Sequence, residues 1–338
     1  MVRHLSREAA SVARYRIFGS ELSPYSVKVR AWFRYKGIAH DWLTRTPANQ
    51  AEYEAHARLP LVPLVITPES EGIQDSTPIM ERFEAAFPEP ASQPGDPMLA
   101  FLSALLEEYG DEWGNKHMFH YRWRDDADQV SAAGRIARSM LPDADEETVA
   151  ERARAVRERM VPRVSFVGSS PETAPVIEAS FARQLELLEA HLEGRRYLFG
   201  GRPAFADFGI AAQVWEAWTD PTGSTLVPPR TRDWCRRMQD PANEGPFEAW
   251  EALAPTLEPL LAEEVGARFL PWSDANARAI ADGAESFAVD IAGGRWTQAP
   301  QRYHARSLRA LREKYAALAD RAALDPVLET TGCRAWLG

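Results

Sequence analysis

Residues 14–87 alternate between strand-like and helix-like patterns of apolar positions. Tyr15–Gly19 is short and apolar enough for a buried strand. Just after it, Val29, Trp32 and Phe33 recur at the spacing of one helix face. The further elements that the pattern predicts are a strand at 39–43, a short helix within 47–58, an apolar strand over 59–67, a partner strand starting at 73–74 and a helix at 77–86. The order is βαβ followed by ββα, which predicts an α/β unit with a mixed sheet and helices on both faces.

A proline-rich stretch separates this unit from the remainder of the chain. Residues 88–97 hold four prolines and no apolar periodicity, which is typical of an interdomain linker. Beyond it, residues 98–338 show a helical pattern. One apolar stripe at helical spacing consists of Ile177, Phe181, Leu185, Leu188 and Leu192. We expect a helical domain with a charged insert at about 125–161 and a C-terminal extension at about 262–338, and an N-terminal extension at 1–13.

The turn Ser23-Pro24-Tyr25-Ser26 lies between the first predicted strand and the first predicted helix. At such a helix start, free backbone N–H groups and the positive end of the helix dipole converge and favour an anion. A hydroxyl group at this point could also hold a thiolate. The same residues suit a plain helix start, because Ser23 is a favourable N-cap and Pro24 fits the first helical position. One exposed hydroxyl group can serve both roles.

Two further signals follow in the α/β unit. Pro63 comes after Val62 and before a predicted strand, and a cis peptide bond there would turn the backbone of Val62 toward a ligand. The alternative is an ordinary trans proline at a strand start. Asp75 and Ser76 open the last predicted helix of the unit. Together they could bind an ammonium and a carboxylate group, or act as a plain N-cap.

In this order, the three signals resemble the N-terminal domain of the glutathione S-transferase superfamily. The resemblance continues more loosely at 198–210 and 230–241 in the helical half. It implies a thioredoxin-like α/β domain followed by an all-α domain, with glutathione as cosubstrate and a homodimer as the assembly. Ser23 matches the position of the family's catalytic Ser or Cys, and Ser26 is the second candidate. The expected glutathione-binding residues are Pro24, Tyr25, Val62, Pro63, Asp75 and Ser76.

Three departures from the family pattern stand out. The helix start near 204 keeps Asp207 but has Ala204 at the N-cap, so half of the capping box is missing. The loop before Pro63 lacks the usual Gly-Lys, and Arg45 is a candidate substitute for the contact to a glutathione carboxylate. Both ends of the turn are serine, and Cys235 and Cys333 lie far from it, so dithiol and mixed-disulfide exchange are not expected.

The stretch 111–123 is the most unusual part of the helical half and is rich in aromatic residues. By the family resemblance it would face the cleft, and we expect Trp113, His117 and His120 to line a pocket for a hydrophobic second substrate. Core packing of these aromatic residues is the alternative. No complete set of metal ligands is evident, so we expect no metal site.

The amino-acid composition limits the classes of partner that we expect. The 39 Lys and Arg residues against 49 Asp and Glu residues give a formal net charge of −10, which argues against a nucleic-acid surface. No stretch is apolar enough to span a bilayer, and residues 1–13 lack a signal-peptide pattern, so we expect a cytoplasmic protein. The leading hypothesis is conjugation of glutathione to a hydrophobic electrophile. The alternatives are a non-catalytic ligand-binding or protein-interaction scaffold, or a glutathione-dependent isomerisation or dehalogenation.

Overall fold

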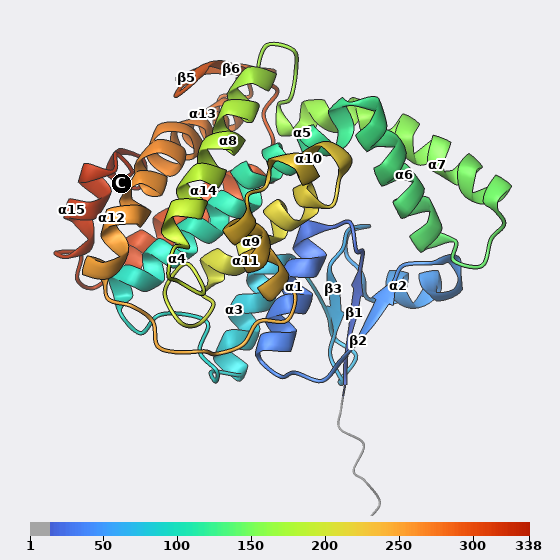
Figure 1. The fold of residues 1–338 in the computed structure, drawn as a ribbon, viewed down its shortest axis with the longest axis horizontal. Coiled ribbons are helices and arrows are strands. Elements are labelled where there is room, and N and C mark those ends of the chain that lie inside the picture. Colours follow the sequence, from blue (N-terminus) through green and yellow to red (C-terminus); the bar gives the residue numbers. More distant parts are fainter. Residues whose placement is uncertain (1–13) are drawn as a thin grey trace, which may run out of the picture.

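A four-stranded mixed sheet forms the base of the molecule, and the computed structural model describes residues 14–338 (Figure 1). Its order is β2-β1-β3-β4. The strands are β1 (Tyr15–Gly19), β2 (His40–Thr44), β3 (Leu64–Ile66) and β4 (Gly72–Gln74). β1 pairs parallel with β2 and antiparallel with β3, and β3 pairs antiparallel with β4. The thioredoxin-like arrangement predicted from the sequence is confirmed.

Helices cover both faces of this sheet. The elements are α1 (Pro24–Tyr35), a short 3₁₀ turn (Pro47–Asn49), α2 (Gln50–His56) and α3 (Ser76–Ala86). On the face of α1 and α3, the buried side chains of Ile17, Phe33 and Phe83 belong to the main core. On the α2 face, Phe18 and Tyr53 form a small separate cluster. Alternate residues of β1 therefore serve opposite faces, as the period of a strand requires.

The helical half begins after the proline-rich stretch and wraps the end of the sheet where β1 leads into α1. Its helices are α4 (Pro97–Tyr109), α5 (Asn115–Arg124), α6 (Asp126–Met140), α7 (Glu146–Met160), α8 (Ala174–His191), α9 (Phe205–Trp218), α10 (Pro221–Leu226), α11 (Pro229–Arg237), α12 (Trp250–Leu260), α13 (Leu270–Ala281), α14 (His304–Ala317) and α15 (Leu324–Thr330). π-Helical segments join α4 to α5 (Gly110–Gly114) and α12 to α13 (Leu261–Phe269), and 3₁₀ segments cover Val161–Val167 and Arg334–Trp336. Within residues 14–338, no helix has the length and apolar character needed to cross a membrane.

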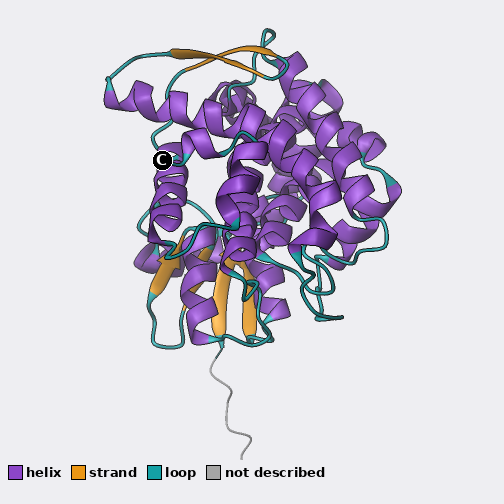
Figure 2. Cartoon of the chain, turned by 90° about the vertical axis from the view of Figure 1, so that its left-hand side faces the viewer, coloured by secondary structure: helices purple, strands orange, loops and turns teal. Residues whose placement is uncertain are grey.

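One part of the C-terminal extension is not helical. β5 (Phe287–Ile291) and β6 (Gly294–Gln298) form an antiparallel hairpin, which Figure 2 shows at the opposite end of the molecule from the four-stranded sheet. The turn between them uses Gly293 at φ 99°, a backbone angle that glycine adopts without strain. The sequence predicted only helices here, although Gly-Gly between short apolar runs is a hairpin signal.

The buried helix α9 starts without a side-chain cap, as the sequence predicted from Ala204. Asp207 supplies the other half of the motif: its carboxylate accepts hydrogen bonds from the backbone N–H of Ala204 (2.9 Å) and Leu198 (2.8 Å) and from the indole N–H of Trp234 (2.9 Å). These donors oppose the burial that raises the pKa of Asp207 to about 7. Asp207 therefore ties the start of α9 to two other segments.

The packing of α9 against α4 depends on glycine. A Cβ atom at Gly209 would lie 2.8 Å from the carbonyl oxygen of Glu107, and one at Gly110 would lie 2.7 Å from the carbonyl carbon of Gly209. Neither distance leaves room for a methyl group beside a backbone that is fixed in a helix. The two helices thus approach each other closely at one point.

We expect Gly209→Ala to destabilise the protein by about 1–3 kcal/mol, because the added methyl group overpacks the α4–α9 contact. Gly134→Ala is the matched control. Gly134 lies within α6, and a Cβ atom added there would have no neighbouring atom within 4 Å, so alanine should stabilise by about 0.5–1 kcal/mol. Urea unfolding of both variants measures the difference. Equal stability of the two variants would contradict the close approach.

Candidate functional site

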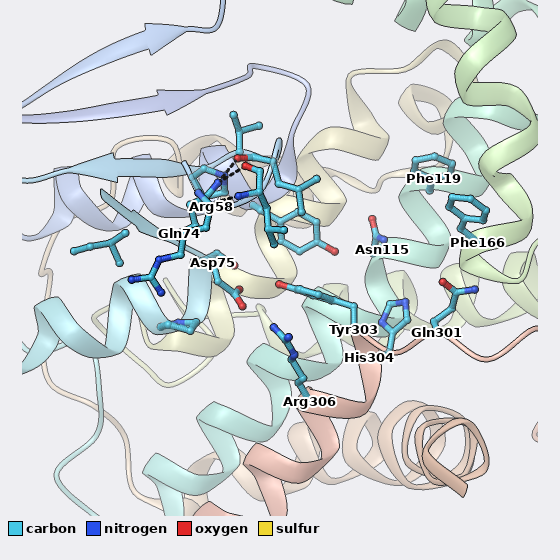
Figure 3. Close-up of a pocket in the computed structure, with 18 of the residues that line it drawn as sticks. Arg58, Gln74, Asp75, Asn115, Phe119, Phe166, Gln301, Tyr303, His304 and Arg306 are labelled. Carbon is cyan, nitrogen blue, oxygen red and sulfur yellow. Dashed lines mark hydrogen bonds between the residues drawn. The ribbon is translucent and has the colours of Figure 1, made fainter. Parts of the chain in front are cut away.

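A cavity of about 680 Å³ lies where the α/β unit, the insert and the C-terminal extension meet (Figure 3). The residues that line it from the α/β unit include Tyr25, Arg58, Val62, Pro63, Gln74, Asp75 and Ser76. Those from the helical half include Asn115, Phe119, Met160, Arg163, Phe166 and Val167. The extension contributes Gln301, Tyr303, His304 and Arg306. The extension thus packs on the helical domain and also reaches the cavity.

The turn before α1 enters the cavity through Tyr25. Ser23 is the N-cap of α1, and its hydroxyl oxygen accepts a hydrogen bond from the backbone N–H of Ser26 at 3.3 Å. The hydroxyl group of Tyr25 donates to the carbonyl oxygen of Asp111 at 2.9 Å. Ser23 and Pro24 are not among the residues that line the cavity. Ser26 is fully buried outside the cavity and cannot contact a ligand there, which corrects its assignment as a second catalytic candidate.

The Val62–Pro63 peptide bond is cis, which is one of the two forms that the sequence left open, and both residues line the cavity. The loop before it is held by Gln74 of β4. The side-chain amide of Gln74 donates to the carbonyl oxygens of Leu59 and Leu61, both at 2.8 Å, and its oxygen accepts from the backbone N–H of Arg58 at 2.8 Å. Gln74 therefore positions the loop, a role that the sequence analysis missed.

Asp75 carries backbone strain at the cavity wall. Its φ of 82° lies in a region that residues other than glycine rarely adopt, and such strain clusters at ligand-binding sites. Within residues 14–338, no Lys or Arg side chain lies within 4 Å of its carboxylate. In Figure 3 the hydroxyl group of Tyr303 points toward Asp75. Burial and the Asp75 carboxylate both raise the pKa of Tyr303, so its hydroxyl group keeps its proton.

Ser76 lines the cavity but directs its hydroxyl group into a buried charge cluster. That hydroxyl donates to Asp111 Oδ2 at 3.2 Å, and Lys28 Nζ lies 3.4 Å from it. Lys28 also pairs with Asp111 at 2.6 Å and with Glu107, and both pairs are almost completely buried. Thr77 completes the cluster by donating to Glu107 at 2.6 Å. The hydroxyl group of Ser76 is thus engaged in the cluster, and only its backbone polar groups remain for a ligand.

Burial controls the protonation of this cluster. Burial lowers the pKa of Lys28, but the carboxylates of Asp111 and Glu107 outweigh it, so that the pKa is raised and the amine stays charged. Burial raises the pKa of Asp111 to about 6, against the opposing effect of Lys28. The adjacent Glu108 has no Lys, Arg or His side chain within 4 Å of its carboxyl group among residues 14–338. Burial and the charge of Glu107 raise its pKa to about 8, although Ser307 and Lys314 of α14 act in the opposite direction.

The structure corrects the predicted second-substrate residues. Trp113, His117 and His120 do not line the cavity and are at most 1% exposed. The indole N–H of Trp113 donates to Ser180 at 2.8 Å, His117 also contacts Ser180, and His120 contacts Ser169. The π-helical segment Gly110–Gly114 explains the error, because its wider turn rotates α5 relative to α4.

Phe119 and Asn115 take the place that these residues were expected to fill. They lie four residues apart on one face of α5, and both line the cavity. Phe119 belongs to the aromatic stretch identified in the sequence. The three corrected residues form core contacts, which was the alternative for that stretch. Within the part of the chain that the structure describes, no group of three or more His, Cys, Asp or Glu residues is arranged to hold a metal ion.

Several basic residues at the cavity were missed. Arg58, Arg163 and Arg306 line it, and within residues 14–338 no carboxylate lies within 4 Å of their guanidinium groups. The fourth arginine of the lining, Arg82, pairs with Glu71 at 2.7 Å. No local motif marks these residues. Arg45, the candidate substitute for the missing Gly-Lys, lies outside the cavity with its guanidinium group 4.1 Å from the ring centre of Tyr53.

The wall that carries Arg163 is fixed by a buried network. Lys116 donates to the carbonyl oxygen of Val167 at 3.0 Å and lies 3.6 Å from the ring centre of Trp272. Gln298 of β6 donates to the carbonyl oxygen of Phe166 at 2.7 Å and accepts from the indole N–H of Trp296 at 3.1 Å. Burial lowers the pKa of Lys116. The β5–β6 hairpin therefore holds the segment Val161–Val167 in place.

Two family models match the chain. Residues 17–91 match the model described as glutathione S-transferase, N-terminal domain, and residues 147–237 match the model described as glutathione S-transferase, C-terminal domain. The first match spans the sheet, the cis Val62–Pro63 bond and Asp75. The chain belongs to the glutathione S-transferase superfamily.

Several solved structures are similar to part of this chain. A β-etherase from Sphingobium sp. strain SYK-6 is 19% identical with a TM-score of 0.45, over 73% of this chain and 98% of that chain. A glutathione S-transferase from Methylobacterium radiotolerans, in complex with glutathione sulfonate, is 18% identical with a TM-score of 0.41, over 72% of this chain and 94% of that chain. Similarity at this level says nothing about activity. Among curated proteins, none matches the sequence significantly.

We expect the free energy of unfolding to fall as the pH rises from about 4.5 to about 8, because the folded state keeps a proton on Glu108 that the unfolded state loses in this range. Glu108→Gln removes this contribution. Between about pH 5 and about pH 9, the stability of the variant relative to the wild type should therefore rise by roughly 4 kcal/mol.

Urea unfolding of both proteins at the two pH values measures this gain. Glu313→Gln, at an exposed position of α14, is the matched control and should show no such change. A difference between Glu108→Gln and the wild type that is the same at both pH values would contradict the raised pKa of Glu108.

Proposed function

We propose that this chain is a glutathione transferase that joins the thiol sulfur of glutathione to a hydrophobic electrophile. The observation that carries the proposal is the meeting of three sequence-distant segments in one cavity: Tyr25, the cis Val62–Pro63 step and Asp75 with Ser76. These are the segments for which the sequence predicted contacts to glutathione. Membership of the superfamily supports the same ligand.

The charges around the cavity complement those of glutathione, which carries one ammonium and two carboxylate groups. The unpaired carboxylate of Asp75 suits the ammonium group. The unpaired guanidinium groups of Arg58 and Arg306 suit the carboxylates, since charge-assisted pairs of this kind are the strong ones. The backbone of Val62 can pair with the extended tripeptide as a neighbouring strand would.

The reaction needs a thiolate, and the start of α1 is suited to stabilise one. The helix dipole favours negative charge there, and accepting a bond from Ser26 leaves the hydroxyl hydrogen of Ser23 available to donate to sulfur. The hydroxyl group of Tyr25 is engaged with Asp111. The thiol proton passes to solvent, sulfur forms a bond to the electrophilic carbon, and the leaving group departs with its bonding electron pair.

A second candidate function is a scaffold that binds glutathione or a related ligand without turnover. The specific observation in its favour is that Ser23 is not among the residues lining the cavity. Glutathione binding by a wild-type protein that conjugates no electrophile would support the scaffold and contradict the transferase. The homodimer and the cytoplasmic location remain predictions from the family resemblance.

We expect Asp75→Asn to raise the dissociation constant of glutathione about tenfold, because it removes the charge opposite the ammonium group. Isothermal titration calorimetry measures this change. Asp143→Asn, at an exposed position outside the cavity, is the matched control and should bind as the wild type does. Equal affinity of the two variants would remove Asp75 from the binding site.

We expect Ser23→Ala to lower kcat/KM for chlorodinitrobenzene about 100-fold and to shift the pH–rate profile upward by about one unit, because the bound thiol loses a donor to its sulfur. Stopped-flow absorbance across a pH series measures both effects. Ser224→Ala, at an exposed position of α10, is the control. Full activity with an unshifted profile would exclude Ser23 from catalysis.

A further inference from the structure

The half of the cavity remote from Asp75 has a wall of distinct chemistry. Phe119 and Phe166 gather at that end in Figure 3. Met160 and Val167 complete its apolar lining. Phe166 is 56% exposed, which is unusual for a large apolar side chain and leaves its ring free to contact a ligand.

One charged side chain stands in this wall. Arg163 lies in the 3₁₀ segment Val161–Val167, and its guanidinium carbon is 6.0 Å from the ring centre of Phe166. Its Nη1 atom is 4.0 Å from the sulfur of Met160. Within residues 14–338, Arg163 has no carboxylate within 4 Å, so its charge is not neutralised by this chain.

We propose that the second substrate is an aromatic electrophile that carries a carboxylate or a similar anionic group, and that Arg163 determines this specificity. The inference rests on the proposed glutathione transfer. Phe119 and Phe166 contact the aromatic ring of the substrate, and the guanidinium group pairs with its anionic substituent. A guanidinium group recognises a planar carboxylate through two parallel hydrogen bonds, which a neutral substrate cannot accept.

The charge distribution along the cavity supports this division. Its acidic lining residues, Glu71 and Asp75, both belong to the α/β side. Glu71 is engaged by Arg82, and Asp75 is assigned to the ammonium group of glutathione. Neither of these lining carboxylates therefore lies at the aromatic wall, where it would repel a negatively charged substrate. Glutathione has two carboxylates for Arg58 and Arg306, which leaves Arg163 for the second substrate.

The wall is also rigid enough to discriminate. The carbonyl oxygens of Phe166 and Val167 are held by Gln298 and Lys116, respectively. A side chain on a fixed backbone segment loses less conformational entropy on binding than one on a mobile loop. The segment that carries Arg163 is thus prepared before the substrate arrives.

Product conjugates test the inference by binding alone, because each fills both halves of the cavity. The probes are S-(dinitrophenyl)glutathione and S-(carboxydinitrophenyl)glutathione, which differ by one carboxylate on the aromatic ring. Isothermal titration calorimetry should show the carboxylated conjugate binding about tenfold more tightly to the wild type. Arg163→Gln should abolish this preference and leave the affinity for the neutral conjugate within about twofold.

Arg159→Gln is the matched control, since Arg159 is exposed near the end of α7 and does not line the cavity. It should keep the preference, and raised salt should weaken the preference in the wild type. Equal affinity of the two conjugates, or a preference that survives in Arg163→Gln, would overturn the role of Arg163 while leaving the proposed function intact. Failure of glutathione and both conjugates to bind would instead overturn the proposed function, and the inference with it.

Discussion

The buried pairing of Lys28 with Glu107 and Asp111 is the interaction on which the arrangement of the two halves depends. Lys28 lies in α1 of the α/β unit, whereas Glu107 lies near the end of α4 and Asp111 in the π-helical segment after it. A buried ion pair adds little stability by itself, but removing one partner leaves an uncompensated charge in the core, at a cost of about 3–5 kcal/mol. Any other placement of the helical half against α1 would separate these charges and would therefore cost free energy.

The same contact determines which polar groups face the cavity. Asp111 accepts a hydrogen bond from Ser76 through its side chain and one from Tyr25 through its backbone carbonyl group. The start of α1 and the start of α3 are therefore both bonded to the same residue of the helical half. Asp75, next to Ser76, has no Lys or Arg partner within 4 Å among residues 14–338 and adopts a strained conformation. A carboxylate that lacks a cationic partner and lies beside a network of hydrogen-bonded polar groups is held in position for a cationic ligand group.

The C-terminal extension completes the site from outside the two family-matched segments. It brings Tyr303 and Arg306 to the cavity at the start of α14, while its hairpin supports the aromatic wall through Gln298 and Trp296. Glu108 faces Ser307 and Lys314 of the same helix, and both oppose the burial that raises the pKa of this carboxyl group.

Local chemistry in the sequence was sufficient to predict the α/β order, because that order depends on residues close along the chain. The cis step at Pro63 and the ligand role of Asp75 and Ser76 came from the family resemblance, since the local pattern also allowed a trans proline and a plain N-cap. The sequence did not reveal Arg58, Arg163 or Arg306, since an isolated arginine has no pattern. Trp113, His117 and His120 were also expected to face the cavity, whereas they face the core. A π-helical turn changes the angular position of every later side chain, and it is stabilised by packing around Gly110 and Gly209 rather than by a local signal. Motifs that act through neighbouring residues were thus readable from the sequence, whereas the cavity wall, built from segments far apart, was decided by tertiary packing.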